Sequence, residues 1–424
     1  MDFTRGQEPG WHVILGSNGA GKSSVIRSIA LLMMGEKEAY ASRQDFSRWM
    51  RSATSESIIS GSLTIDREFD MLSGGGYPPE RPITAEVKLK TNDEGLTARV
   101  DAIYSGERTQ RTIWGAGLGW FSASFGPFRR FTGGDRIYDR LFVSNKRLAP
   151  HLTALGEDVA LTEALGWLTS LHIQNLQDER SHQTSNAAVV LNLILSFLNA
   201  SRFLPHNAVI AEVTNDQVFV TDGNKARVSL DQMSDGYRSA LSLTMELLRQ
   251  MFELYGFDIM RRAMVEGEPG VVSAPGVVAI DEVDAHLHPT WQRDIGVWLT
   301  THFPRVQFIV TTHSPIVCRA IAGQNNEIKG SVWRLESPGS NQRFHRVTGE
   351  ELEALAYGDV LDAYGTELFG TGVTRSEAGN HKLARLAELN RTALERSLTE
   401  QEKEERHGLR VALPAEAGRL DEVV

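Results

Sequence analysis

The chain has 424 residues, one cysteine and a formal net charge of −10, from 54 acidic and 44 basic side chains. A single cysteine excludes an intrachain disulfide and fits a reducing compartment, so we expect a cytoplasmic location. The acidic balance argues against a generally cationic coat for nucleic acid. No apolar run approaches the roughly 20 residues needed to cross a bilayer, so we expect no membrane contact.

The first predicted elements are a buried strand at residues 11–15 and a helix at residues 24–33. Between them, Gly16–Ser23 reads G-S-N-G-A-G-K-S and matches the phosphate-binding pattern G-x-x-x-x-G-K-[ST]. Glycines let the backbone curl with its N–H groups turned inward, and the helix start adds the positive end of its dipole. The alternative, a plain glycine-rich turn, does not explain why the loop joins a strand to a helix.

We therefore predict that this loop binds the phosphates of a nucleotide. Lys22 would reach the β- and γ-phosphates, and the Ser23 hydroxyl would ligate Mg²⁺. The residues predicted to contact the nucleotide are Gly16, Ser17, Asn18, Gly19, Ala20, Gly21, Lys22, Ser23 and Ser24.

Three β-rich stretches follow, at residues 58–66, 83–90 and 97–104, and predict an antiparallel layer. Further along, the segment Phe128–Arg147 has six basic side chains against two acidic ones, with aromatic residues interleaved. Basic side chains contact nucleic-acid phosphates and aromatic faces stack on unpaired bases, so DNA or RNA contact near Arg129–Arg147 is one hypothesis. The other is an ordinary solvated surface.

Residues 159–203 are predicted to form an inserted helical region. Its second half, from Val189 to Leu198, is so apolar that it must be buried. Strands are expected to resume near residues 208–229, before the second half of the core.

The string Ser234-Asp235-Gly236 precedes an amphipathic helical pattern. Ser234 is a good N-cap, and Gly236 lets an anion approach the backbone at the helix start. Taken alone, the string is also typical of an ordinary helix cap.

The stretch Gly276–Glu282 reads G-V-V-A-I-D-E, which predicts a fully buried parallel strand that ends in two carboxylates. Ligands of open α/β sheets bind at this end of the strands. Adjacent strand residues face opposite sides, so the two acids are expected to differ in role. Asp281 suits the Mg²⁺ shell, and Glu282 suits polarising an attacking water. The alternative is a strand end with two solvated acids.

The next β-rich run, Phe308–Thr312, leads directly into His313. About one helix and one strand separate His313 from Asp281, so a neighbouring parallel strand is expected to carry it, within reach of the γ-phosphate. A lone histidine at a strand end is otherwise more often structural.

After residue 348 the chain changes character, because residues 350–368 and 377–409 predict charged, amphipathic helices. Mixed acids and bases between Leu383 and Arg406 suggest an exposed helical hairpin. This extension is either a solvated cap or a docking element for a partner.

Taken in order, these motifs resemble those of the ABC-type ATPase superfamily, on the branch of RecF, SMC and OLD-like proteins: Gly16–Ser23, Ser234–Gly236, Asp281 with Glu282, Asp284, and His313. The resemblance implies an α/β fold, a P-loop ATPase head with a parallel core sheet, an antiparallel β-layer, an inserted helical region and a helical C-terminal extension. The implied domains are the head at residues 1–348 and the extension at residues 349–424.

The resemblance also implies a homodimer or a higher even oligomer. In that superfamily two ATP molecules are sandwiched between two heads, and the signature loop of each head completes the site of the other. Carried over, Ser234 and Gly236 would bind the γ-phosphate in trans. Glu282 would be the general base, and His313 would sense the phosphate.

A glutamine after the first helix contacts Mg²⁺ in those relatives, and Gln44 is the candidate here, beside Ser23 and Asp281 as the other expected Mg²⁺ ligands. In relatives a Gly-Pro-x-Arg turn also lies near the nucleotide. Arg129 or Arg130 is therefore an alternative phosphate contact rather than a contact to nucleic acid.

The signature string at residues 233–237 is Met-Ser-Asp-Gly-Tyr, whereas transporter ATPases usually carry Leu-Ser-Gly-Gly-Gln. With the Asp-Ala-His-Leu-His-Pro run at residues 284–289 and the helical extension, it resembles the Septu-type defence ATPases. Those are encoded beside an HNH nuclease and are sometimes attached to a retron. The implied function is an ATPase switch in antiphage defence, slow or trigger-dependent, that controls a separate HNH-type nuclease. The alternative is a RecF-like DNA-binding clamp or loader in DNA repair.

Overall fold

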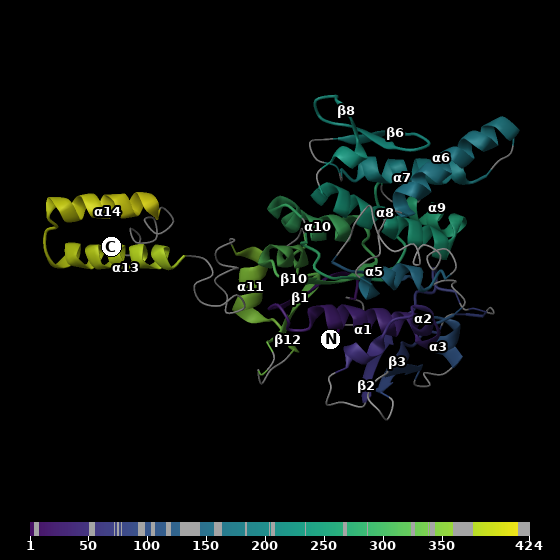
Figure 1. Ribbon diagram of the computed structural model, residues 1–424, viewed down its shortest axis with the longest axis horizontal. Coiled ribbons are helices and arrows are strands. Elements are labelled where there is room, and N and C mark those ends of the chain that lie inside the picture. Colours follow the sequence, from purple (N-terminus) through teal and green to yellow (C-terminus); the bar gives the residue numbers. More distant parts are fainter. Residues whose placement is uncertain are drawn as a thin grey trace. The chain divides into compact units, whose positions relative to one another are not determined.

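The computed structural model describes residues 1–3, 8–50, 56–71, 73, 76–77, 79–91, 98–102, 107–115, 120–127, 145–156, 163–182, 185–202, 204, 208–233, 235–265, 269–285, 287–323, 327–337, 339, 344–358 and 376–413. The chain divides into two compact units, Met1–Tyr357 and Gly358–Val424. Figure 1 shows the elements of both units.

The first unit is built on a six-stranded sheet with the strand order β12-β11-β1-β10-β9-β5. Neighbouring strands pair in parallel, except for the antiparallel pair of β11 and β12. The strands are β1 (Gly10–Gly16), β5 (Ser122–Phe125), β9 (Gly276–Ile280), β10 (Val306–Thr312), β11 (Gly330–Leu335) and β12 (Phe344–Arg346). The parallel core sheet confirms the predicted α/β fold class.

The central position of β10 decides where the motifs meet. Leu15 of β1 pairs with Thr312 of β10, and Val310 of β10 pairs with Ile280 of β9. Since the three strands run in the same direction, their carboxyl ends lie at one edge of the sheet. The prediction that His313 follows a parallel neighbour of the Asp281 strand is therefore confirmed.

Helix α1 (Lys22–Met34) lies between the core sheet and an antiparallel layer, as Figure 1 shows. Leu31 and Met34 of α1 are fully buried in one cluster with Val87 of the layer and Ile309 of β10. The layer has the order β2-β3-β4 and matches the three predicted β-rich stretches. Its strands are β2 (Glu56–Leu63), β3 (Ile83–Thr91) and β4 (Ala98–Ala102).

The inserted helical region contains α6 (Glu163–Ser181) and α7 (Ala187–Ala200). A small antiparallel sheet follows it, formed by β6 (Val209–Val213), β7 (Val218–Thr221) and β8 (Arg227–Ser229). Ile194 of α7 is fully buried, and the ring of Phe197 packs 5.5 Å from that of Phe303. The predicted burial is wrong at Val189, which is 42% exposed, because 3.6-residue periodicity places it off the apolar stripe.

The first unit has further helical segments among its described residues. They are α2 (Glu36–Ala41), η1 (Phe46–Trp49), α3 (Glu107–Arg111), η2 (Ala149–His151), α5 (Leu152–Leu155), η4 (Leu230–Gln232), α8 (Asp235–Tyr255), α9 (Phe257–Val265), α10 (Pro289–His302), η5 (Pro315–Ile321) and α11 (Gly349–Tyr357).

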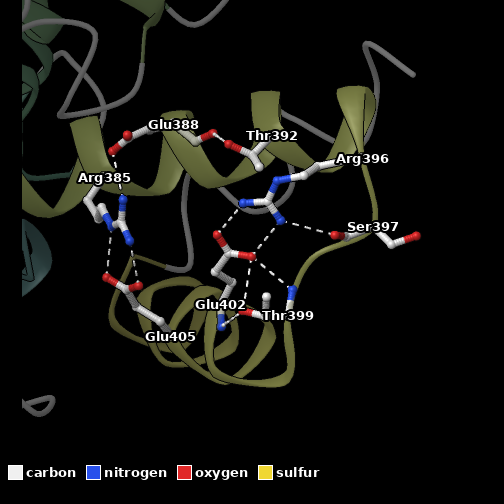
Figure 2. Close-up of polar contacts among 8 residues, drawn as sticks. All are labelled: Arg385, Glu388, Thr392, Arg396, Ser397, Thr399, Glu402 and Glu405. Atoms are coloured by element: carbon white, nitrogen blue, oxygen red, sulfur yellow. Dashed lines mark hydrogen bonds and ion pairs between the residues drawn. The ribbon is translucent and has the colours of Figure 1, made fainter.

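In the second unit, α13 (Glu377–Glu395) and α14 (Glu400–Ala412) pack against each other as the predicted charged hairpin. Figure 2 shows the polar contacts that join them. Arg385 donates to both carboxylate oxygens of Glu405, and Glu402 accepts from Arg396 and completes a capping box at the start of α14. Exposed ion pairs contribute little each, so the caps and the few buried leucines matter more. Among the helices that the structure describes, none is long and apolar enough to cross a membrane.

Two substitutions in α7 test which face of this helix packs against the core of the first unit. Ile194→Ala should lower the free energy of unfolding by about 2–5 kcal/mol, because it removes fully buried methyl groups and leaves a cavity. Val189→Ala, at the exposed position of the same helix, should change it by less than about 0.5 kcal/mol. Denaturant unfolding measures both, and equal losses at the two positions would contradict the assigned core face.

Candidate functional site

The phosphate-loop motif lies between β1 and α1, as its sequence predicts. Gly16 is required by close packing, because a Cβ there would lie 2.6 Å from the carbonyl oxygen of Leu335. Gly21 has a φ of +109°, a conformation that side chains other than glycine rarely adopt. Gly21 also precedes α1 without a side-chain cap, so it leaves the first-turn N–H groups of the helix available to an anion.

Lys22 is a buried cation at the centre of this loop, with 5% of its surface exposed. Its Nζ donates to the carbonyl oxygens of Gly16 at 2.8 Å and Ser17 at 3.1 Å. Burial lowers the pKa of Lys22, whereas the carboxylates of Glu282 and Asp281 raise it. The loop lysine therefore lies within the field of both predicted acids, which come from the far half of the sequence.

His313, which follows the last residue of β10, also contacts Lys22. Its Nε2 lies 2.8 Å from Lys22 Nζ. Because an ammonium group can only donate, the ring nitrogen must be the acceptor. Burial, and then the charge of Lys22, lower the pKa of His313 below its ordinary value of 6.5, so the ring is neutral near pH 7.

Asp281 and Glu282 follow the last residue of β9, and β10 holds both of them. Asp281 is buried, and its Oδ1 accepts a hydrogen bond from Thr311 Oγ1 at 2.5 Å. The backbone N–H of Glu282 donates to the same Thr311 oxygen at 2.8 Å. Two residues on, Asp284 accepts from Thr312 Oγ1 at 2.6 Å. The hydroxyls of Thr311 and Thr312 thus anchor the acidic turn, residues Asp281–Asp284.

This chain is similar in sequence to a described protein family and to named retron and Septu proteins. A family model described as "AAA domain, putative AbiEii toxin, Type IV TA system" matches residues 124–319. The Retron Ec83 probable ATPase of Escherichia coli is 35% identical over 130 residues, which are 31% of this chain and 20% of that protein. The Septu protein PtuA of Bacillus mycoides is 25% identical over 331 residues, which are 76% of this chain and 37% of that protein.

Septu proteins and retron ATPases are relatives of this chain. These matches confirm the resemblance to the defence ATPases that the motifs indicated, and the chain spans well under half the length of either protein. Among solved structures, the SMC head bound to the C-winged helix domain of ScpA is 14% identical, with a TM-score of 0.40 over 81% of this chain and 91% of that one.

For the remaining predicted site residues, the structure gives fewer contacts. Ser234 lies outside the described residues, whereas Gly236 is half-buried in the first turn of α8. Gln44 is half-buried just after α2, where its backbone N–H donates to Ser42 Oγ at 3.4 Å. Their roles toward the nucleotide and Mg²⁺ stay predictions.

The proposed basic patch needs a correction at Arg147. Residues 128–144, which carry most of the patch, lie outside the described residues. Arg147 is 6% exposed and donates to the carbonyl oxygens of Gly115 at 2.9 Å and Thr112 at 3.1 Å, and burial lowers its pKa to about 10. Since its guanidinium is committed to backbone carbonyls inside the protein, Arg147 is not a contact for DNA or RNA.

Sequence reasoning missed two contributors to the site. Thr311, which binds the acidic turn, lies in a β-rich run where the sequence pattern indicates no role for it. Ser337, whose hydroxyl lies 2.8 Å from that of Ser17, was not singled out at all. The available signal for Thr311 was a hydroxyl residue on the strand predicted to pair with the Asp281 strand.

Proposed function

We propose that this chain is an ATP-binding and ATP-hydrolysing head that forms an ATP-sandwich dimer and acts as a switch in antiphage defence. The observation that carries the ATPase part is the meeting of Lys22, His313 and the Asp281–Glu282 pair at one edge of the parallel sheet. The names of the relatives, Septu protein and retron ATPase, support the defence setting. Because this chain spans only part of their length, their activity and partners enter as proposals.

The residues present fit ATP and Mg²⁺. The uncapped first turn of α1 and the buried ammonium of Lys22 suit a phosphate chain, whose oxygens would take the place of the loop carbonyls as acceptors. The Ser23 hydroxyl and the Asp281 carboxylate are oxygen donors of the kind that Mg²⁺ takes, and Gln44 is the third proposed ligand. When bound, Mg²⁺ neutralises charge on the phosphate oxygens.

Glu282 is the proposed general base. Its carboxylate lies within the electrostatic reach of Lys22, on the turn that follows the buried Asp281. There it would accept a proton from the water that attacks the γ-phosphate. His313 is already in contact with Lys22, so a γ-phosphate that binds Lys22 would also meet the His313 ring, which is the proposed phosphate sensor.

The proposed composite dimer depends on the signature string at residues 233–237. Gly236 lies in the first turn of α8, and the start of a helix suits a phosphate. We propose that Ser234 and Gly236 bind the γ-phosphate held by the opposite protomer, so that a homodimer or a higher even oligomer is the active form. Hydrolysis that requires this assembly would be slow or trigger-dependent in the isolated protein.

The nuclease chemistry of the defence response is assigned to a separate partner of the HNH type. The second unit is the proposed docking element. Its helices carry apolar side chains that remain exposed, namely Leu394 at 76% and Val411 at 68%. Most helical stability comes from packing of an apolar face, so a two-helix hairpin with few buried leucines gains stability when another surface covers it.

Glu282→Gln tests the chemical role of the general base. The amide keeps the size of the side chain but cannot accept the proton, so turnover should fall at least about 100-fold. Binding of ATP should be retained, and the ATP-bound dimer should accumulate. Phosphate release and gel filtration with ATP measure these effects. Turnover at the wild-type rate would show that Glu282 is not the base.

Complementation tests the composite site. Ser234→Arg would spoil the site of the partner, whereas Lys22→Ala would spoil the protomer's own site. In a heterodimer of the two variants both lesions fall on one nucleotide, and the other site is wild-type.

Each variant alone should be inactive, and the mixture should regain part of the ATPase rate if one intact site suffices. The rate of the Ser234→Arg protein alone is decisive. Full turnover there would contradict action in trans and leave Ser234 as a helix cap.

A further inference from the structure

We propose that Thr311 is the positioning residue of the hydrolytic centre: its hydroxyl fixes the Asp281 carboxylate and the backbone of Glu282 in one arrangement. The inference rests on the proposed ATPase function and adds a residue that acts through the two acids without touching the substrate. Its basis is the set of contacts between the end of β10 and the turn after β9.

The hydrogen-bond pattern leaves one assignment for the Thr311 proton. The N–H of Glu282 can only donate, so Thr311 Oγ1 accepts there, at 2.8 Å. The single hydroxyl proton is then directed to Asp281 Oδ1, at 2.5 Å. One hydroxyl thus links the carboxylate of Asp281, the proposed Mg²⁺ ligand, to the backbone of Glu282, the proposed general base.

The backbone at Glu282 gives a second, independent reason. Glu282 has a φ of +46°, in the left-handed region that non-glycine residues occupy only when neighbours hold them there. The N–H groups on both sides of its Cα are bound by Thr311: that of Glu282 by the hydroxyl, and that of Val283 by the carbonyl oxygen at 3.0 Å. Thr311 therefore holds the turn that directs the Glu282 side chain.

Burial makes the contact hard to replace. Thr311 is fully buried and Asp281 is 4% exposed, so water has no ready access to the groups that would lose their partner. Thr312, the next residue, contacts Asp284 instead. Thr311 and Thr312 therefore hold different parts of the turn, and of these two threonines only Thr311 contacts both Asp281 and the backbone of Glu282.

The test compares variants that lose or keep one hydroxyl while the shape of the side chain changes little. Thr311→Val keeps the shape of the side chain and removes the two hydrogen bonds of the hydroxyl, and Thr311→Ser keeps the hydroxyl. Thr244→Val is the matched control, because Thr244 is also fully buried but donates to Ala240 O within its own helix. Each protein is assayed for its melting temperature, for kcat and KM of ATP hydrolysis, and for ATP affinity with Mg²⁺ and with EDTA.

For Thr311→Val we expect kcat to fall about 10- to 100-fold with KM within about threefold, because the lost contacts orient groups that act in the transition state. The gain in ATP affinity from Mg²⁺ should shrink, since Asp281 is no longer oriented. Thr311→Ser should restore kcat to within about threefold of wild type. Thr244→Val should leave kcat and the Mg²⁺ effect unchanged, because its hydroxyl donates to a carbonyl of its own helix.

Wild-type kcat in a folded Thr311→Val protein would overturn the inference, and so would a loss that Thr311→Ser fails to recover. If Thr311→Val does not fold, Thr311→Cys, whose thiol is a weak donor and acceptor, gives the same comparison. Failure of the proposed function is distinguishable. In that case the wild type neither binds nor hydrolyses ATP, whereas an error confined to Thr311 leaves an active wild type that Glu282→Gln inactivates.

Discussion

The parallel pairing of β10 with β1 on one side and β9 on the other is the constraint on which the rest of the first unit depends. It brings the phosphate loop, the acidic turn and His313 to one edge of the sheet, although they lie far apart in the sequence. Side chains alternate along a strand, so a slip of one residue between β9 and β10 would turn Thr311 away from Asp281, and a slip between β1 and β10 would shift the phosphate loop relative to His313. The geometry of the candidate site is therefore a property of strand register.

The buried cations Lys22 and Arg147 show how the same physical problem takes two forms. A charge removed from water needs polar partners. Arg147 is held by backbone carbonyls and ties loops together. Lys22 has carbonyls too, but it also contacts a neutral imidazole and lies in the field of the acids Asp281 and Glu282. Of these two sites, only the one around Lys22 combines donors that can bind a phosphate with carboxylates that can bind a divalent cation.

Much of this architecture could be predicted from the sequence, because the strongest signals were local. The glycine pattern at Gly16–Ser23 fixes a strand, loop and helix, and the apolar run before Asp281 fixes a buried strand. The Thr311 contacts could not be predicted, since they depend on the register between β9 and β10. Arg147 was misjudged for a related reason: charge counts along the chain do not show which basic side chains fold inward.

Calorimetric titration with ATP in the presence of Mg²⁺ tests the central claim most directly. The account predicts saturable binding by the wild type that Lys22→Ala weakens about 10-fold or more, because a hydrogen bond to a charged group contributes about 1.5–3 kcal/mol. Lys403→Ala, which removes an exposed lysine of the second unit, should bind as the wild type does. Absence of binding by the wild type, or equal affinity in Lys22→Ala, would contradict the assignment of this edge of the sheet as a nucleotide site.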